Sequence, residues 1–307
     1  MKRHTWTVAE EENDIRLDHF LVARLEGSRS QIQKQIKMQG VEVGGKKITV
    51  PHFFLEAGDV VTTAFDAEEK TITDETPPEI NIIHEDDDVL VLNKPAGLLV
   101  HSAPGAIGPT LVDALRIHYP KIDEVGEPSR PGIVHRLDRF VSGVMIVAKT
   151  QRAYELLKDQ FKNHTIEKRY RALVNGRLEK EVGEIRFTIA RGPKGRMAAR
   201  PEENEDGKES VTKYAIRKRY ANATELDVEI ETGRTHQIRA HFHALGHPIV
   251  GDTLYTIRKQ RAIAFPRLWL HAESLTIPLL GEAVPHTFNA PLPDKLAEFT
   301  KKLHAIN

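Results

Sequence analysis

The 307-residue sequence contains no cysteine. This absence excludes disulfide frameworks, thiolate nucleophiles and cysteine-ligated zinc, so any chemistry must come from carboxylates, histidines, lysines, hydroxyls or a bound cofactor. The sequence also lacks a run of about 20 apolar residues, which spanning a bilayer requires, and a charged-then-apolar stretch at its start. We therefore expect a soluble protein of the cytoplasm with no membrane partner.

An excess of either charge is missing too, because 44 lysines and arginines balance 44 aspartates and glutamates. Proteins that bind nucleic acid usually carry clustered positive charge, since neutralising phosphates supplies much of their affinity. Any nucleic-acid site in this protein must therefore be a local patch. Nothing in the sequence demands more than a monomer.

Familiar cofactor motifs are absent as well. The sequence has no Gly-x-Gly-x-x-Gly fingerprint, no Walker loop and no His-Glu-x-x-His pair. The sequence therefore lacks the motifs that usually identify a dinucleotide-binding enzyme, a nucleoside-triphosphatase or a zinc protease.

The chain divides into two predicted domains. Residues 1–67 contain two predicted helices, at 17–25 and 28–38, followed by short strands and glycine-rich turns. Residues 68–79 are rich in acids, threonine and proline and show no periodicity, which indicates a linker. Residues 80–307 alternate short apolar runs with turns and a few helices, which favours a mixed α/β or α+β domain over a helical bundle.

In residues 1–67, Ser28 is a plausible N-cap of the second predicted helix.

The larger domain offers clear candidates for regular elements. Residues 192–207 are rich in Gly, Pro, Glu and Asn, so we expect a mobile insertion there. The clearest predicted strands are 89–92, 144–148, 170–174 and 226–230, and the predicted helices are 110–118, 152–163, 235–245 and 293–304.

Four segments place polar, reactive residues between apolar runs, namely residues 84–100, 130–149, 167–176 and 232–248. In the first, an apolar strand runs into Asn93, Lys94 and Pro95. Taken alone, this pattern is best explained as a strand followed by a turn.

The second segment has the densest group of charges, with His135, Arg136, Asp138 and Arg139 between two apolar runs. Charges at such a junction are costly unless they pair or face a cleft. A lone aspartate in a turn usually serves the turn, but the flanking arginines make a functional site an equal alternative.

The third and fourth segments each allow two interpretations. Tyr170 opens a strand directly after two cations, and it is either a half-buried packing residue or a face on which a base stacks. On the predicted helix of the fourth segment, His236, Arg239 and His243 share one face. A metal hydrolase would use the histidines of this segment, His236, His241, His243 and His247. We expect no metal, because no carboxylate or cysteine ligand stands at a familiar spacing.

Taken together, the four segments resemble the RluA family of pseudouridine synthases. The key match is His-Arg-Leu-Asp at His135 to Asp138, followed by Ser142-Gly143. The segments Asn-Lys-Pro-Ala-Gly, Lys-x-Tyr-x-Ala-Leu-Val and Gly-Arg-Thr-His-Gln-Ile-Arg reinforce it. Residues 1–67 similarly resemble the S-four-type RNA-binding module often joined to this catalytic domain, through Arg16-Leu-Asp-His-Phe-Leu21 and Ser28-Arg-Ser30.

The resemblance implies the fold and the activity. It implies a catalytic domain with a central mixed, mostly antiparallel sheet flanked by helices, preceded by a small α/β RNA-binding module. The implied enzyme is an isomerase that detaches uracil from its ribose, rotates it and rejoins it through carbon 5, without metal, redox cofactor or energy donor. The partner is RNA, with large-subunit ribosomal RNA expected ahead of transfer RNA.

The resemblance also implies residue roles. Asp138 acts as the nucleophile or a base at the ribose, Arg239 holds it ionised and oriented, and Tyr170 stacks on the flipped base and assists the final proton transfer. The implied substrate-binding residues are His135, Arg136, Arg234, His236 and Leu270 around the target, and Arg29, Lys34 and Lys37 in the N-terminal module.

One departure and one rival interpretation stand beside this resemblance. After the aspartate the family usually has a polar run ending in Thr-Ser-Gly, whereas this chain has Arg139-Phe140-Val141-Ser142-Gly143. This difference affects the expected target contacts more than the nucleophile. The rival interpretation is a non-catalytic RNA-binding or ribosome-assembly factor with the same fold, against which the retained Asp138, Tyr170 and Arg239 argue.

Overall fold

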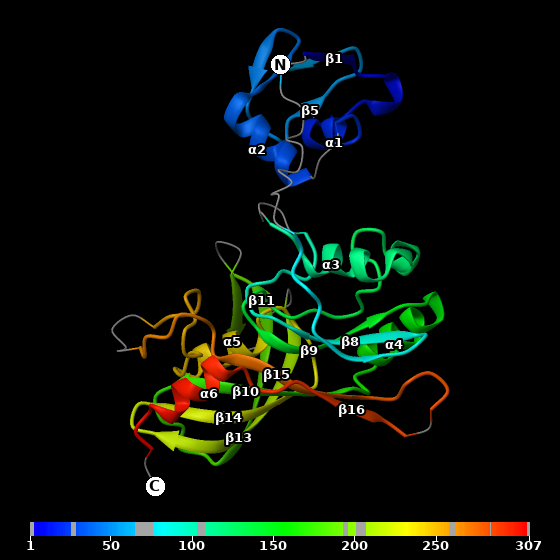
Figure 1. Cartoon of the computed structure of the whole chain (residues 1–307). Coiled ribbons are helices and arrows are strands. Elements are labelled where there is room, and N and C mark those ends of the chain that lie inside the picture. The colour runs from blue at the N-terminus through cyan, green and yellow to red at the C-terminus, as the bar shows by residue number, and fades with distance from the viewer. Residues whose placement is uncertain are drawn as a thin grey trace. The chain divides into compact units, whose positions relative to one another are not determined.

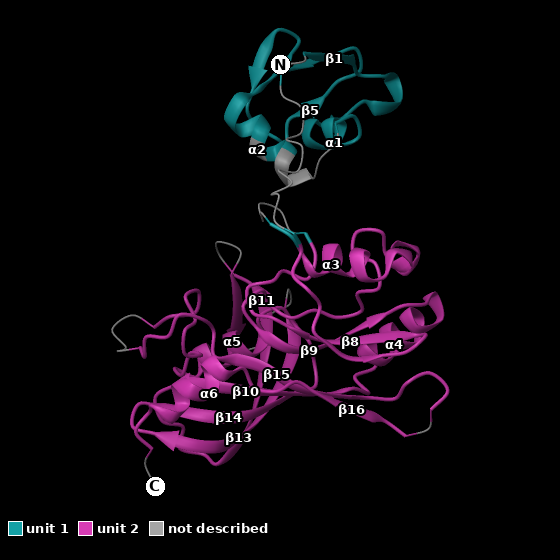
Figure 2. Cartoon of the chain, viewed as in Figure 1, with its two compact units in different colours: residues 1–76, 102–109 teal, residues 77–101, 110–307 magenta. Residues whose placement is uncertain are grey.

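A computed structural model of the chain describes residues 3–25, 29–64, 76–102, 108–192, 196–200, 207–257, 262–282 and 284–305 (Figure 1). Within these ranges the side chains of residues 29–31, 34 and 200 are not described. The chain forms two compact units, residues 1–76 with 102–109 and residues 77–101 with 110–307 (Figure 2). The first division falls within the predicted 68–79 linker, of which residues 68–75 lie outside those described. The predicted domain limits themselves stay a prediction.

The first unit packs two short helices against small antiparallel sheets. Its core consists of apolar side chains from both helices and from the strands, including Phe20, Leu21, Ile32 and Ile36. The elements are β1 (His4–Thr7), β2 (Ile15–Arg16), α1 (Leu17–Val22), α2 (Arg29–Gln39), β3 (Val41–Val43), β4 (Lys46–Ile48), β5 (Phe54–Leu55) and β6 (Val60–Thr63). They form a four-stranded sheet in the order β1-β6-β3-β4 and a pair β2-β5. The proposed N-cap Ser28 lies outside the described residues.

The second unit is built on one ten-stranded sheet. The strand order is β12-β11-β13-β14-β10-β15-β9-β8-β7, and β16 pairs with β15. Neighbours are antiparallel except β9 and β15, which are parallel. The strands are β7 (Ile82–Glu85), β8 (Val89–Lys94), β9 (Ser142–Ala148), β10 (Glu167–Asn175), β11 (Val182–Arg191), β12 (Met197–Arg200), β13 (Lys208–Tyr220), β14 (Ala223–Ile230), β15 (Leu270–Ile277) and β16 (His286–Asn289).

Helices cover both faces of this sheet. On β9, Met145 and Val147 pack into the cluster that contains α3 and α5, while Val144 and Ile146 pack into the cluster that contains α4. Successive strand residues point to opposite faces, so one buried strand serves two cores. The helices are α3 (Leu111–His118), α4 (Gln151–Lys162), α5 (Gln237–Ala244) and α6 (Asp294–Lys301) (Figure 1). The predicted α+β class, with a mixed and mostly antiparallel sheet flanked by helices, is confirmed.

The predicted elements are found within a few residues of their expected ends. Thr110 and Thr150 accept backbone N–H bonds as the N-caps of α3 and α4, which explains why those helices begin there. The predicted mobile insertion at residues 192–207 contains a regular strand, β12, which pairs with β11, and its mobility stays a prediction. None of the helices in the described ranges has the length and hydropathy of a membrane span.

Candidate active site

A cavity of about 500 Å³ lies in the second unit, where the loop before β9 meets β10, the start of β15 and the first turn of α5. It gathers all eight residues that the sequence predicted in this domain: Asp138, Tyr170, Arg239, His135, Arg136, Arg234, His236 and Leu270. They come from residues 130–149, 167–176 and 232–248 and from Leu270. The fold therefore brings three of the four motifs to one cavity, together with the start of β15.

Asp138 and Arg239 form the central ion pair. Arg239 Nη1 donates to Asp138 Oδ2 at 2.9 Å, across 101 residues of sequence. The same guanidinium donates through Nε and Nη2 to the two oxygens of Asp252, at 2.7 and 3.0 Å. Asp252 also accepts the backbone N–H groups of Leu254 and Tyr255. The planar guanidinium is thus fixed from behind by one carboxylate and presents its remaining edge to Asp138.

The charge of Arg239 is secure in this arrangement. Burial alone would favour the neutral form, but the hydrogen bonds and charges of Asp252 and Asp138 outweigh it and raise the pKa of Arg239. Arg239 therefore presents a fixed positive charge and an N–H donor to Asp138, which orients that carboxylate at the cavity wall.

Tyr170 lies beside this pair on β10. In the pairing of β10 with β15, Arg169 lies opposite Ser274 and Tyr170 lies opposite Ala272, so the one extra residue is on β15 and Tyr170 keeps its place in the regular strand β10. Burial, together with the charge of Asp138, raises the pKa of Tyr170. The phenol therefore stays protonated at neutral pH, and its ring is available as an apolar stacking surface.

His135 supports the loop that carries Asp138. Its Nε2 accepts the backbone N–H of Ile146 at 3.0 Å, and its ring stacks on Phe161 with centroids 4.5 Å apart. Burial lowers the pKa of His135 to about 3, with a smaller contribution from Lys168. A neutral imidazole that accepts a backbone hydrogen bond can hold the loop but brings no positive charge to a phosphate.

The other end of the loop is held by the Asn-Lys-Pro-Ala-Gly segment. Lys94 is fully buried, and its Nζ donates to the carbonyl oxygens of Pro95, Leu98 and Arg139. Gly97 N donates to Arg139 O at 2.8 Å, and Arg139 Nε donates to Gly97 O at 2.9 Å. The first motif is therefore more than a strand and a turn, because it fixes Arg139, the residue next to Asp138.

The same contacts explain how the loop accommodates its unusual sequence. The Arg139 side chain reaches back to the Gly97 carbonyl, while Phe140 is 51% exposed and Val141 is buried in the core. The backbone turn is closed by a hydrogen bond from Val141 N to Asp138 O at 3.1 Å. The departure from the family pattern thus changes the outer surface of the loop and leaves Asp138 in position.

The cavity is strongly cationic although the whole chain is neutral. Its charged lining residues are Asp138 and six cations, Arg130, Arg136, Lys162, Lys168, Arg234 and Arg239. Among the described side chains, Arg234 Nε and His101 Nδ1 are buried in this lining without a hydrogen-bond partner. Buried polar atoms without protein partners are rare, so these two atoms are available to hydrogen-bond a water or a ligand in the cavity. This lining is the local patch that a polyanion requires of a protein without net charge.

The histidines of α5 do not form a metal site. His243 contacts Arg196 and the Thr256 carbonyl, and His247 contacts the Asn175 carbonyl. His241 is buried against Phe187, and burial lowers its pKa to about 4. Within the described ranges, no three histidine or acidic side chains are arranged to hold a metal ion. The metal-hydrolase alternative therefore has no support from the geometry.

The three predicted residues of the first unit are placed only in part. Arg29, Lys34 and Lys37 all belong to α2, and Lys37 is exposed. The side chains of Arg29 and Lys34 lie outside the described residues. Their proposed contact with RNA stays a prediction.

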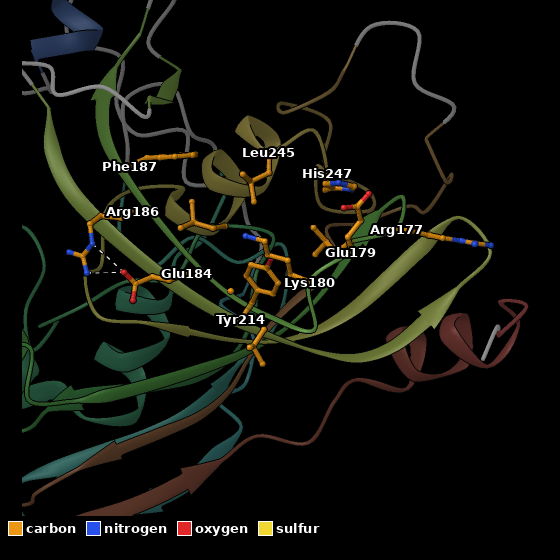
Figure 3. Close-up of a pocket in the computed structure, with 13 residues that line it drawn as sticks. Arg177, Glu179, Lys180, Glu184, Arg186, Phe187, Tyr214, Leu245 and His247 are labelled. Carbon is orange, nitrogen blue, oxygen red and sulfur yellow. Dashed lines mark hydrogen bonds and ion pairs between the residues drawn. The ribbon is translucent and has the colours of Figure 1, made fainter.

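A second cavity, of about 450 Å³, lies between β11, the turn at residues 177–181 and the end of α5 (Figure 3). It contains none of the residues predicted for the RNA site, and only His247 of the histidines named for the metal-hydrolase alternative. Its lining mixes both charges, and Arg186 on its wall is paired with Glu184 and Glu209. Balanced and partly paired charges do not match a polyanion, so the cavity around Asp138 is the better candidate.

Sequence reasoning missed Asp252, which contacts Arg239, Tyr255, which contacts His236, and Lys168 in the cavity lining. Asp252 and Tyr255 follow α5 in a segment of turns without periodicity, so no pattern linked them to Arg239. Lys168 could have been found, because it stands two residues before Tyr170 and strand alternation places both on the same face.

Comparison with known proteins assigns both units. Residues 88–244 match the family model of RNA pseudouridylate synthases, and residues 15–61 match that of the S4 domain. An uncharacterized RNA pseudouridine synthase of Bacillus subtilis is 38% identical over 97% of both chains. Proteins named ribosomal large subunit pseudouridine synthase D are also similar, at 36% identity in Pasteurella multocida (91% of this chain, 87% of that one) and 34% in Zymomonas mobilis (98% of both).

Solved structures agree with this assignment. The human RNA pseudouridylate synthase domain containing 1 matches with a TM-score of 0.56 and 27% identity, over 76% of this chain and all of that one. The chain therefore belongs to the RNA pseudouridylate synthases of the RluA type, isomerases that act on RNA, and carries an N-terminal S4 domain.

Proposed function

We propose that this enzyme isomerises uridines of large-subunit ribosomal RNA to pseudouridine, with Asp138 as the nucleophile. The geometry that carries the proposal is the 2.9 Å ion pair between Asp138 and Arg239 in a cavity whose other charges are positive. The choice of ribosomal RNA is supported by the relatives named ribosomal large subunit pseudouridine synthase D. They match this chain along nearly its whole length, S4 domain included. An enzyme of ribosomal RNA would work in the cytoplasm.

The proposed reaction follows from these positions. A uridine flipped out of its helix would enter the cavity, at a cost of a few kcal/mol that loops and distorted stems reduce. Tyr170 would stack on the base, and Leu270 would form an apolar wall. Asp138, oriented by Arg239, would attack the nucleoside and allow uracil to detach, rotate and rejoin through carbon 5. Unpaired Arg234 and exposed Arg136 would hold neighbouring phosphates.

The test uses RNA that carries tritium on carbon 5 of uridine, because the isomerisation releases that hydrogen. Large-subunit ribosomal RNA and transfer RNA would each be incubated with the wild type and with Asp138→Asn, which keeps the shape of the side chain and removes its charge. We expect release from ribosomal RNA by the wild type alone. Tritium release only from transfer RNA would contradict the proposal that ribosomal RNA is the substrate. RNA binding without any tritium release would favour the interpretation as a non-catalytic RNA-binding factor.

A further inference from the structure

His236 occupies a strained position at the edge of the catalytic cavity. It precedes the first turn of α5 with φ 57° and ψ 22°, in the left-handed region that non-glycine residues rarely adopt. Its ring lines the cavity together with Asp138 and Tyr170. Strain of this kind persists where the surrounding structure fixes a functional side chain.

A chain of hydrogen bonds sets the tautomer of His236. The hydroxyl of Tyr255 has one proton, which it donates to the Met197 carbonyl at 3.0 Å. The same oxygen lies 3.1 Å from His236 Nδ1, so it must accept a proton from that nitrogen. Tyr255 is 1% exposed, which leaves little room for water to replace either bond. The neutral ring therefore carries its proton on Nδ1 and has a lone pair on Nε2.

The free nitrogen lies beside the nucleophile. His236 Nε2 is 3.8 Å from Asp138 Oδ2, too far for a hydrogen bond, and it has no hydrogen-bond partner within the described residues. Burial is the main factor that lowers the pKa of His236. Arg239 and Arg136 lower it as well, and together these effects outweigh the carboxylates of Asp138 and Asp252. Near neutral pH the ring thus offers an unprotonated nitrogen to the cavity.

The reaction requires a base at this place. When uracil rejoins the ribose, carbon 5 bonds to C1′ and still carries its hydrogen, which must leave. Carbon 5 is bonded to C1′ in the new linkage and to C6 in the ring. Whether Asp138 attacks C1′ or C6, the proton to be removed is on a carbon directly bonded to the attacked atom. A group within 4 Å of the Asp138 carboxylate is therefore within reach of that proton.

We propose that His236 Nε2 is the general base that removes the proton from carbon 5 in the last step of isomerisation. The C5–H bond breaks, and its electron pair forms the C5=C6 double bond. The displaced C6=N1 pair moves to N1, which takes a proton from water, and the imidazolium returns its proton to solvent. Tyr170 suits this step less, because its phenol stays protonated in the cavity. The proposal rests on the isomerase activity and on Asp138 as nucleophile.

The decisive variant is His236→Asn. Asparagine tolerates the left-handed backbone and can still donate to Tyr255, but it provides no basic nitrogen. We expect product formation to fall by about 10²–10⁴-fold, the usual contribution of a general base. Uridine deuterated at carbon 5 should then react more slowly than ordinary uridine with the variant and equally fast with the wild type, because proton removal limits only the variant.

A second variant separates base catalysis from positioning. His236→Gly suits the left-handed backbone and leaves space for a free imidazole. Added imidazole should restore tritium release by this variant in proportion to its unprotonated form, and should have no such effect on Asp138→Asn. Without an isotope effect in His236→Asn and without rescue in His236→Gly, His236 is a positioning residue and another group takes the proton. Tritium release by the wild type tests the isomerase itself, so the two failures are distinguishable.

Discussion

At the residue scale, the structure assigns Asp252 a role that only the fold reveals. Its carboxylate holds two of the Arg239 nitrogens while the side chain itself is fully buried. Removing one partner of a buried ion pair leaves an uncompensated charge. We expect Asp252→Asn to lower the free energy of unfolding by about 3–5 kcal/mol. Single-turnover isomerisation should also slow, because Arg239 no longer has a fixed orientation toward Asp138.

Urea denaturation and single-turnover kinetics would check this prediction. The matched control is Asp227→Asn, whose carboxylate pairs with Arg217 at 2.9 Å with both side chains more than 40% exposed. An exposed pair contributes about 0–1 kcal/mol, so this control should change neither measurement noticeably. Equal effects of the two substitutions would contradict the role of Asp252.

His135 predicts a specific dependence of stability on pH. Its pKa is about 3 in the folded protein and near 6.5 when unfolded, so between these values only the unfolded chain binds the proton. The stabilising contribution is complete above pH 6.5 and is lost as the pH falls toward 3. We expect wild-type unfolding to become easier across this window, by roughly 2 kcal/mol more than in His135→Asn. Chemical denaturation of both proteins at pH 7 and pH 4 would measure the difference, and parallel losses would refute it.

The site residues that could be predicted from the sequence share one property. Asp138, Tyr170 and Arg239 lie in dense polar segments between apolar runs, and their chemistry is visible without the fold. Asp252 contacts Arg239 and Tyr255 contacts His236, at sequence separations of 13 and 19 residues. No periodicity of the sequence predicts these contacts. Lys94 was visible in its motif, but its contact with the Arg139 carbonyl spans 45 residues and depends on the fold.

At the element scale, the parallel pairing of β9 and β15 brings Leu270 beside the Asp138 loop. The pair runs from His271 opposite Ser142 to Ala272 opposite Gly143. Gly143 has φ 124°, and a Cβ there would lie 2.1 Å from the Ala272 carbonyl oxygen. Only glycine allows this close approach of two strands.

Gly143→Ala should therefore destabilise the second unit. Overpacking of this kind costs about 1–3 kcal/mol, and the strained backbone adds to it. Thermal unfolding would measure the loss. Gly233→Ala is the matched control, because a Cβ at Gly233 meets no atom within 4 Å and its φ is not positive. A Gly143→Ala protein as stable as this control would show that the strands can separate without cost.

The elements that sequence missed are those with weak periodicity. β8 and β9 are buried on both faces and appear as continuous apolar runs, which is why they were predicted. β11 and β13 alternate charged and apolar residues and are half-exposed, so their sequences are also compatible with loops. β12 follows glycine and proline, and its strand conformation comes from pairing with β11 rather than from local preference.

At the scale of the whole molecule, a chain without net charge can bind RNA because its acidic and basic residues are unevenly distributed. The acids of the chain pair with bases elsewhere, as in Arg116 with Asp123 and Lys213 with Glu231. In the catalytic cavity the bases outnumber the acids six to one. The net charge of the chain therefore hides this local excess of positive charge, because it sums the cavity with the rest of the protein.

The S4 domain supplies the remaining test at this scale. Arg29, Lys34 and Lys37 lie on its second helix, and we expect them to contact RNA phosphates. Replacing all three with glutamine in the full chain should weaken RNA binding. The slope of log affinity against log salt should fall by about 2–3, since each lost phosphate contact removes about 0.7–0.9. The rate at saturating RNA should stay unchanged, because none of these residues belongs to the cavity around Asp138. A slower saturated rate with an unchanged salt slope would instead assign this helix to the positioning of the target uridine.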